Sequence, residues 1–374
     1  MTMLLSTAQI VSLIKSPLAK QRTIIIEGEN GIGKTGIYHA VKSDPYFANH
    51  IHIDPIDCTQ LSDGSVWMPD LDRELGVSRE LPNERFGVSK TNQKGVNGSR
   101  PVLIFLDEIA KARQYIKDVL APIAYEHRVG NYHFAEGSVV FCATNLSTEG
   151  LGDSIQAHLR NRLIFVRMRK PTQPEWRTWA LNKGLSAEVI AFTDEYTTVF
   201  DSFLDYEDGG KYADKQMHKH NPMIFNPRES QLAYASPRSL HGASDVVASA
   251  DLYDKDTLLA ALEGTIGEVA ASKLATFIEF GTENPSFRDV VANPDTAKIA
   301  KSPVAQIVMS LKVISQTNTR EEAEAVVKYM RRMRNEIQSM FCNSLANSDR
   351  IGTFITIKDF GAMLAENKIL FATK

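Results

Sequence analysis

Short apolar runs alternate with amphipathic segments through the first 170 residues of the chain. Apolar or β-branched runs typical of buried strands occur at 23–27, 50–54, 102–106, 138–143 and 163–168. Apolar positions at helical spacing predict helices at 4–15, 35–42 and 109–126. Gly130-Asn131 predicts the turn of a hairpin over 127–134. This alternation predicts an α/β fold, in which a parallel sheet carries helices on both faces.

The rest of the chain has a different pattern. Residues 55–100 are rich in proline and glycine, and we expect loops around one or two short helices there. After Pro171 the strand patterns end. We therefore expect an α/β domain over 1–170, a helical domain over 171–284 that a polar stretch at 206–231 interrupts, and a mainly helical domain over 285–374. A short β pair is predicted near 354–357.

Composition narrows the class of protein. The chain has 374 residues, a net charge of −3 and three cysteines, none of them in a CxxC pair. This disfavours a disulfide scaffold or a structural zinc site and fits a reducing compartment. No apolar run approaches the roughly 20 residues of a membrane helix, and residues 1–15 lack the apolar stretch of a signal peptide. We expect a cytoplasmic protein without a membrane partner, and one that does not coat nucleic acid by bulk charge.

One segment matches a phosphate-binding motif along its whole length. Residues 28–35 read GENGIGKT, which fits GxxxxGK[ST], and they follow a predicted strand and open a predicted helix. Glycines let backbone N–H groups curl around phosphates, and the helix N-terminus adds a positive dipole. Lys34 would contact the β- and γ-phosphates of ATP. The nucleotide-contacting residues that we expect are Gly28, Glu29, Asn30, Gly31, Ile32, Gly33, Lys34, Thr35 and Gly36.

Acidic and amide side chains follow two other predicted strands. Asp107 and Glu108 end the run at 102–106, and Asn145 ends the run at 138–143. Ligands of open α/β sheets bind at the carboxyl ends of the strands. Thr35 and Asp107 are therefore the candidate ligands of Mg²⁺, and Glu108 is the candidate base that activates water. Asn145 would hold the same water from the other side.

Taken in order, these motifs resemble those of AAA+ ATPases, and within them the MoxR-like branch. Residues 28–35 resemble Walker A, 106–109 Walker B and 143–145 sensor 1. Residues 158–163 resemble the segment with the arginine finger, for which Arg162 is the first candidate and Arg160 the second. Residues 236–240 resemble sensor 2, with Arg238 facing the γ-phosphate. The resemblance covers about residues 1–280.

The resemblance implies an ATP hydrolase that binds ATP or ADP with Mg²⁺ and forms a ring, usually a hexamer. It also implies remodelling of a partner protein, often one with a von Willebrand A-type domain. An insert at about 60–100 and the hairpin at 127–134 would contact that substrate. Residues 60–100 lack the usual pattern of the family, and 285–374 have no counterpart in it.

Two alternatives remain open from the sequence. The first is a nucleic-acid motor or loader that uses the same ATPase site. Its candidate contacts are Lys328, Arg331, Arg332 and Arg334, with Lys90, Lys94 and Arg100 in the insert. The second alternative is a nucleotide switch that does not hydrolyse ATP, and the presence of Glu108 argues against it.

Overall fold

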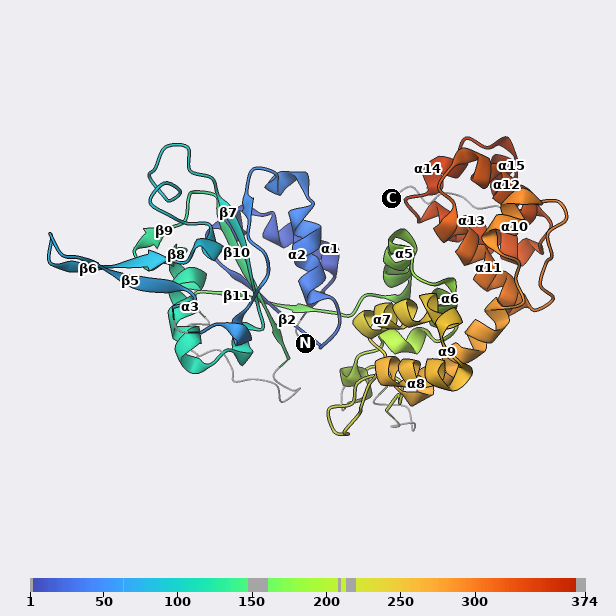
Figure 1. Cartoon of the computed structure of the whole chain (residues 1–374), viewed down its shortest axis with the longest axis horizontal. Coiled ribbons are helices and arrows are strands. Elements are labelled where there is room, and N and C mark those ends of the chain that lie inside the picture. Colours follow the sequence, from blue (N-terminus) through green and yellow to red (C-terminus); the bar gives the residue numbers. More distant parts are fainter. Residues whose placement is uncertain (1–2, 63, 147–160, 208–209, 213–219, 368–374) are drawn as a thin grey trace. The chain divides into compact units, whose positions relative to one another are not determined.

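The computed structural model describes residues 3–62, 64–146, 161–207, 210–212 and 220–367. The chain divides into two compact units, Met1–Lys170 and Pro171–Lys374. Figure 1 shows a sheet in the first unit and helices throughout the second. None of the helices in the described part of the chain has the length and apolar character needed to cross a membrane.

A parallel sheet forms the centre of the first unit. Its strands are β1 (Leu4–Leu5), β2 (Ile24–Gly28), β3 (Ile51–His52), β4 (Ile56–Asp57), β7 (Val102–Asp107), β10 (Val139–Asn145) and β11 (Ile164–Met168). Their order across the sheet is β1-β11-β2-β10-β7-β3, and β4 pairs with the C-terminal end of β7, whereas β3 pairs with its N-terminal end. All the pairs are parallel. The sheet confirms the predicted α/β class, and each predicted run forms a strand.

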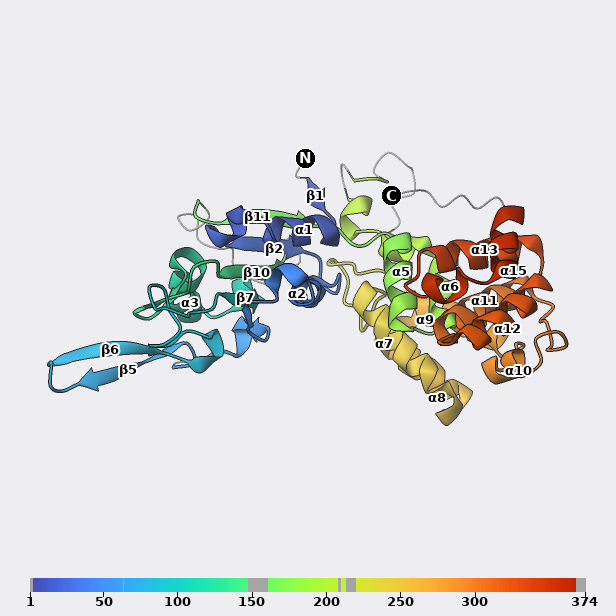
Figure 2. The ribbon, with the colours of Figure 1, turned by 90° about the horizontal axis from the view of Figure 1, so that it is seen from above.

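Each face of the sheet buries its own apolar cluster, as strand alternation requires. Ile24 and Phe105 point toward the side of α1 (Thr7–Ile14) and α2 (Lys34–Lys42). Ile25 and Leu106 point toward the side of α3 (Gln114–Glu126). Figure 2 shows these helices on the two faces of the sheet. The predicted layering with helices on both faces is therefore confirmed.

Three local predictions are wrong or incomplete. The helix expected over 4–15 begins only at Thr7, because Leu4 and Leu5 pair with β11 as an edge strand. The pattern at 109–126 is split into the 3-10 helix η5 (Ile109–Lys111) and α3. The β pair expected near 354–357 is helical instead, since α14 spans Ile351–Phe354 and buries Phe354 in the core.

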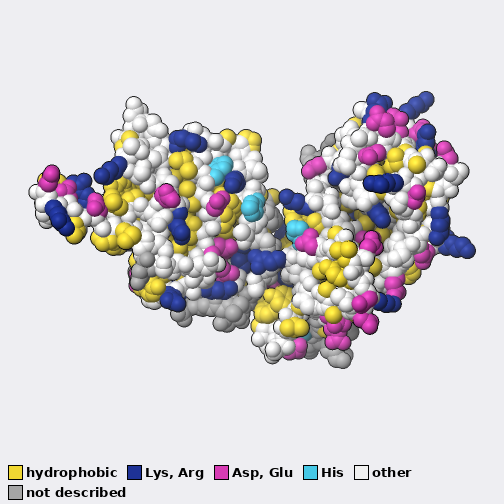
Figure 3. Space-filling view, in the orientation of Figure 1, with side chains coloured by type: hydrophobic (Ala, Val, Ile, Leu, Met, Phe, Trp, Pro, Cys, Tyr) yellow, Lys and Arg dark blue, Asp and Glu magenta, His cyan; other side chains and the backbone are white. Residues whose placement is uncertain are grey.

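Residues 60–100 contain a β ribbon that the sequence did not predict. Strands β5 (Trp67–Asp72) and β6 (Val77–Pro82) pair antiparallel over their whole length. Figure 1 shows the ribbon reaching out from the sheet. Figure 3 shows charged and hydrophobic side chains mixed on it. Pro69 and Pro82 hid these strands, because proline is expected only where a strand needs no N–H donor, as at an edge.

The base of the ribbon packs on the hairpin that the sequence did predict. The hairpin comprises β8 (Arg128–Val129) and β9 (Tyr132–His133), with Gly130 at its turn. Gly130 has a φ of 53°, and a Cβ placed there would lie 2.7 Å from the carbonyl oxygen of Glu80 in β6. The hairpin joins α3 to the segment before β10, so the ribbon rests on a connection between two elements of the sheet layer.

The second unit is helical. Its helices are α5 (Gln173–Lys183), α6 (Ala187–Glu195), α7 (Pro237–Ala248), α8 (Lys255–Ile266), α9 (Glu268–Gly281), α10 (Phe287–Ala292), α11 (Pro303–Gln316), α12 (Arg320–Arg331), α13 (Asn335–Ala346), α14 and α15 (Lys358–Glu366). One continuous apolar cluster includes Trp176, Phe277 and Phe341. Residues on both sides of position 284 thus share one core.

A buried polar cluster links three helices of this unit. The Asp194 carboxylate in α6 accepts a hydrogen bond from Gln173 and lies 3.5 Å from the Arg177 guanidinium of α5. Arg177 also donates to Ser344 of α13. Burial raises the pKa of Asp194 to about 6, although Arg177 and Gln173 oppose this. The cluster fixes α5 and α6 against α13 by polar contacts inside the apolar core.

The close contact at Gly130 predicts that adding one methyl group there lowers the stability of the fold considerably. In Gly130→Ala the new Cβ meets the Glu80 backbone, so we expect the free energy of unfolding to fall by about 2–3 kcal/mol. Gly76→Ala is the matched control, because Gly76 also has a positive φ of 62° but has open space around it. It should cost only about 1 kcal/mol. Urea denaturation measures both, and equal losses would contradict the contact.

The raised pKa of Asp194 predicts the sign of a pH dependence. The folded state holds this proton more tightly than the unfolded chain, whose Asp pKa is about 4. The stability that Asp194 contributes should therefore fall as pH rises from about 4 through about 6. Denaturation of the wild type and Asp194→Asn at several pH values measures the difference, which should shrink over this window. Asp44→Asn is the opposite-sign control, since a hydrogen bond from Lys15 lowers the pKa of Asp44.

Candidate functional site

The phosphate-binding motif forms a tight loop between β2 and α2. Strand β2 ends at Gly28, and α2 begins at Lys34. Gly31 and Gly33 have φ values of 74° and 97°, which L side chains rarely adopt. A Cβ on Gly28 would lie 2.6 Å from the Ile32 side chain and 3.3 Å from the Met168 carbonyl oxygen. The glycines of the motif are thus required by backbone conformation at two positions and by close packing at a third.

The Lys34 side chain is buried at the centre of the loop. Its Nζ donates to the carbonyl oxygens of Gly28 and Glu29, both at 2.8 Å. It also donates to Oδ1 of Asn145 at 2.6 Å. Because β10 pairs with β2 so that Asn145 lies opposite Gly28, the two motifs meet at the carboxyl edge of the sheet. The structure therefore brings together the predicted Lys34 and Asn145.

Asp107 and Thr35 form the next pair along this edge. Thr35 Oγ1 donates to Asp107 Oδ2 at 2.9 Å. Burial raises the pKa of Asp107, and the Thr35 hydrogen bond opposes this shift. Asp57 is the last residue of β4, and the register of β4 with β7 places it opposite Asp107. A hydroxyl and a carboxylate are hard oxygen ligands of the kind that Mg²⁺ prefers. Two protein ligands suit this cation, because water and phosphate oxygens usually complete its coordination shell.

Glu108 has the backbone conformation of a functional outlier. Its φ of 55° and ψ of 34° lie in the left-handed region, which is uncommon for a residue other than glycine. Its Oε2 lies 3.1 Å from Lys111 Nζ, and its Oε1 accepts from Asn145 Nδ2 at 3.4 Å. Asn145 therefore bridges Lys34 and Glu108. Lys111 was missed by the sequence reasoning, although its spacing of three from Glu108 on a helical turn was a usable signal.

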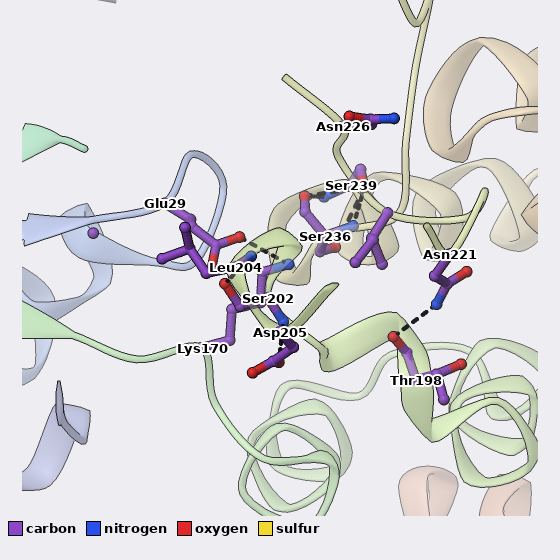
Figure 4. Close-up of polar contacts among 12 residues, drawn as sticks. Glu29, Lys170, Thr198, Ser202, Leu204, Asp205, Asn221, Asn226, Ser236 and Ser239 are labelled. Carbon is purple, nitrogen blue, oxygen red and sulfur yellow. Dashed lines mark hydrogen bonds and ion pairs between the residues drawn. The ribbon is translucent and has the colours of Figure 1, made fainter. Parts of the chain in front are cut away.

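Glu29 and Lys170 form a buried ion pair beside the loop, which the sequence reasoning also missed. Their charged atoms lie 3.1 Å apart, and their side chains are 8% and 5% exposed. Figure 4 shows the two side chains directed toward each other. Glu29 was predicted only as one of the loop residues. No sequence pattern signalled the pair, because the two residues are 141 positions apart. Glu29 follows the end of β2, and Lys170 follows the end of β11.

The other predicted site residues have different environments. Ile32 is buried in the apolar cluster of α1 and α2, so it anchors the loop. Arg162 is exposed and lies just before β11. Arg160 lies outside the described residues. Arg238 is exposed in the first turn of α7, whose N-cap Ser236 exchanges hydrogen bonds with Ser239, as Figure 4 shows.

Comparison with known proteins gives a likeness of fold. No protein-family model matches the chain, and no curated protein matches it by sequence. Among solved structures, a variant of RuvB from Thermotoga maritima is 14% identical with a TM-score of 0.35, covering 76% of this chain and 72% of that one. NtrX from Brucella abortus in complex with ADP is 13% identical with a TM-score of 0.37, covering 97% and 68%. Hsp104 with ATPγS and casein is 15% identical with a TM-score of 0.28, covering 46% and 33%.

These three structures are AAA+ ATPases. Their TM-scores are too low to carry an argument about the site, so the fold is assigned from the chain itself. The five central strands lie in the order fifth, first, fourth, third and second, and the phosphate loop follows the first of them. The helical unit follows the sheet along the chain. The protein has an α/β fold of the AAA+ type with a helical C-terminal region.

Proposed function

We propose that the protein is a Mg²⁺-dependent ATPase of the AAA+ type. The observation that carries this proposal is the chain of contacts from Lys34 through Asn145 to Glu108. It places a phosphate-binding cation, an amide and a carboxylate next to one another at the carboxyl edge of the sheet. The Thr35–Asp107 pair lies on the same edge. No other set of described residues supports a different reaction as well.

Each of these residues would have a separate role in ATP hydrolysis. The N–H groups of the loop and the Lys34 ammonium bind the phosphates and offset their charge. Thr35 and Asp107 would hold Mg²⁺, which supplies charge neutralisation of the β- and γ-phosphates when bound. Glu108 orients the attacking water and accepts its proton, and Asn145 keeps that carboxylate directed at the loop. Lys111 holds the second carboxylate oxygen of Glu108.

The proposed arginine finger would act on a neighbouring subunit. Strand β11 runs parallel to β2, and Ile164 lies opposite Ile24, at the start of β2. Arg162 precedes Ile164 by two residues, so it lies roughly 20 Å along the strands from the level of Gly28 at about 3.3 Å per residue. It is too far from the loop of its own chain to contact a phosphate bound there. A shared site favours a ring, and six subunits is the number that we propose.

The output that we propose is remodelling of a partner protein, as the resemblance to the MoxR-like branch implies. The β5–β6 ribbon and the β8–β9 hairpin support this proposal, because they offer surface outside the sheet and connect to α3 and the segment before β10. A partner with a von Willebrand A-type domain is the first to test. The proposal that Arg238 of the helical domain over 171–284 contacts the γ-phosphate likewise follows from the resemblance.

Three of the seven candidate contacts of the nucleic-acid alternative have partners within the chain, and Lys90, Lys94, Lys328 and Arg334 are exposed. Arg331 pairs with Glu366, and Arg332 donates to the Pro294 carbonyl oxygen and lies over the Tyr329 ring. Arg100 donates to the carbonyl oxygens of Asn49 and His50. Fluorescence anisotropy with single- and double-stranded DNA, with and without ATP, discriminates the two outputs. Tight binding that weakens steeply with salt would favour the alternative.

Glu108→Gln should separate nucleotide binding from turnover. The amide keeps the size of the side chain but cannot accept a proton, so we expect steady-state ATP hydrolysis to fall by at least about 100-fold. Binding of a fluorescent ATP analogue should change by less than about threefold. Glu84→Gln, at an exposed glutamate, is the control and should keep full turnover. Unchanged turnover in Glu108→Gln would show that another group is the base.

A mixing experiment should test the shared site. Arg162→Ala and Lys34→Ala should each reduce turnover by about 100-fold or more, because each removes a charge from the transition state. In a mixed ring, a subunit with an intact loop can lie beside one with an intact Arg162. The mixture should therefore hydrolyse ATP faster than either variant alone. Turnover that stays at the level of the separate variants would contradict a finger in trans.

A further inference from the structure

The Glu29–Lys170 pair differs from an ordinary surface ion pair. Close by on β11 and β2, Arg167 (three residues before Lys170) lies 3.4 Å from Glu27 (two residues before Glu29), with side chains 43% and 28% exposed. Glu29 and Lys170 lie just beyond the ends of these strands and are 8% and 5% exposed. The chain thus carries two neighbouring ion pairs, of which Glu27–Arg167 is partly exposed and Glu29–Lys170 is buried. Only the buried pair includes a residue of the phosphate loop.

Stability alone does not account for the buried pair. Removing two charges from water is costly, and apolar residues of similar size are often at least as stabilising. An exposed pair such as Glu27–Arg167 also contributes little. The position of Glu29 offers a further explanation. Its own carbonyl oxygen accepts a hydrogen bond from Lys34 at 2.8 Å, so its carboxylate belongs to the loop that would receive the phosphates.

A carboxylate in this loop opposes the binding of an anion. Like charges repel more strongly where water is excluded, and Glu29 is nearly enclosed. The ammonium of Lys170, at 3.1 Å, cancels this charge. A lysine just beyond β11 therefore sets the net charge of a loop that follows β2.

We propose that Lys170 is a positioning residue for nucleotide binding, which neutralises the Glu29 carboxylate in the phosphate loop. The proposal rests on the proposed ATPase function. It predicts that the two side chains depend on each other. Without Lys170, Glu29 repels the phosphates, whereas without Glu29 the loop no longer needs Lys170 for neutrality.

The test is a double-mutant cycle read by equilibrium binding of a fluorescent ATP analogue with Mg²⁺. Lys170→Met should weaken binding by at least about 10-fold, because it leaves an uncompensated carboxylate beside the phosphates. Glu29→Gln should bind at least as tightly as the wild type. The double variant should return to within about threefold of Glu29→Gln. The exposed pair is the matched control, and Glu27→Gln, Arg167→Met and their double variant should bind like the wild type.

A second measurement separates repulsion from loss of structure. The weakening in Lys170→Met should be larger for the ATP analogue than for the corresponding ADP analogue, since the repulsion grows with phosphate charge. A general loosening of the loop would weaken both ligands equally, and this result would overturn the proposal. A double variant as weak as Lys170→Met would also overturn it. If Lys170→Met does not fold, the Glu29→Gln variant still tests the proposal. A 10-fold loss of nucleotide binding in Glu29→Gln would contradict repulsion of the phosphates by Glu29.

The wild type and Lys34→Ala serve as reference in the same titration. If the wild type does not bind the nucleotide more tightly than Lys34→Ala, the proposed ATPase function fails. If it does, and the cycle shows no dependence between Glu29 and Lys170, the inference about Lys170 fails alone.

Discussion

The buried ammonium of Lys34 is the constraint on which the arrangement of the first unit depends. A charged group removed from water must find partners, and the partners of Lys34 include oxygens of Gly28, Glu29 and Asn145. Two of these come from the loop itself and the third from a neighbouring strand. The loop must therefore keep its curled form, and β10 must pair with β2 in the register that brings Asn145 to the edge. Asn145 in turn holds Glu108, so one buried charge arranges the candidate catalytic groups.

The sequence predicted the parts of the fold and site that depend on local patterns. Apolar runs located the central strands, and the glycine spacing located the loop. The contacts of Lys34, Asn145 and Glu108 agree with the expectation that side chains at the carboxyl ends of neighbouring strands meet. Lys111 and Lys170 were not predicted. Lys170 acquires its partner only through the pairing of β11 with β2, and no local pattern encodes that register.

The failures at β5, β6 and α14 have a different cause. Proline and glycine in 60–100 are typical of loops, yet the ribbon tolerates Pro69 and Pro82 because it has no further strand to pair with among the described residues. At 351–357, the β-branched residues favour a strand, but packing of Phe354 against Phe341 and Phe360 decides for a helical turn. In both places tertiary context outweighs intrinsic propensity.

The placement of β11 has a mechanical consequence. This strand leads directly to Pro171, where the second unit begins, and it has parallel partners on both sides, β1 and β2. A load applied to the chain beyond Lys170 in the direction of β11 would act along this strand. It loads the hydrogen bonds to both neighbours in shear, so that they resist together instead of opening one after another. The strand that leaves the sheet toward Pro171 is thus held on both sides, and its release would require the hydrogen bonds to β1 and β2 to break.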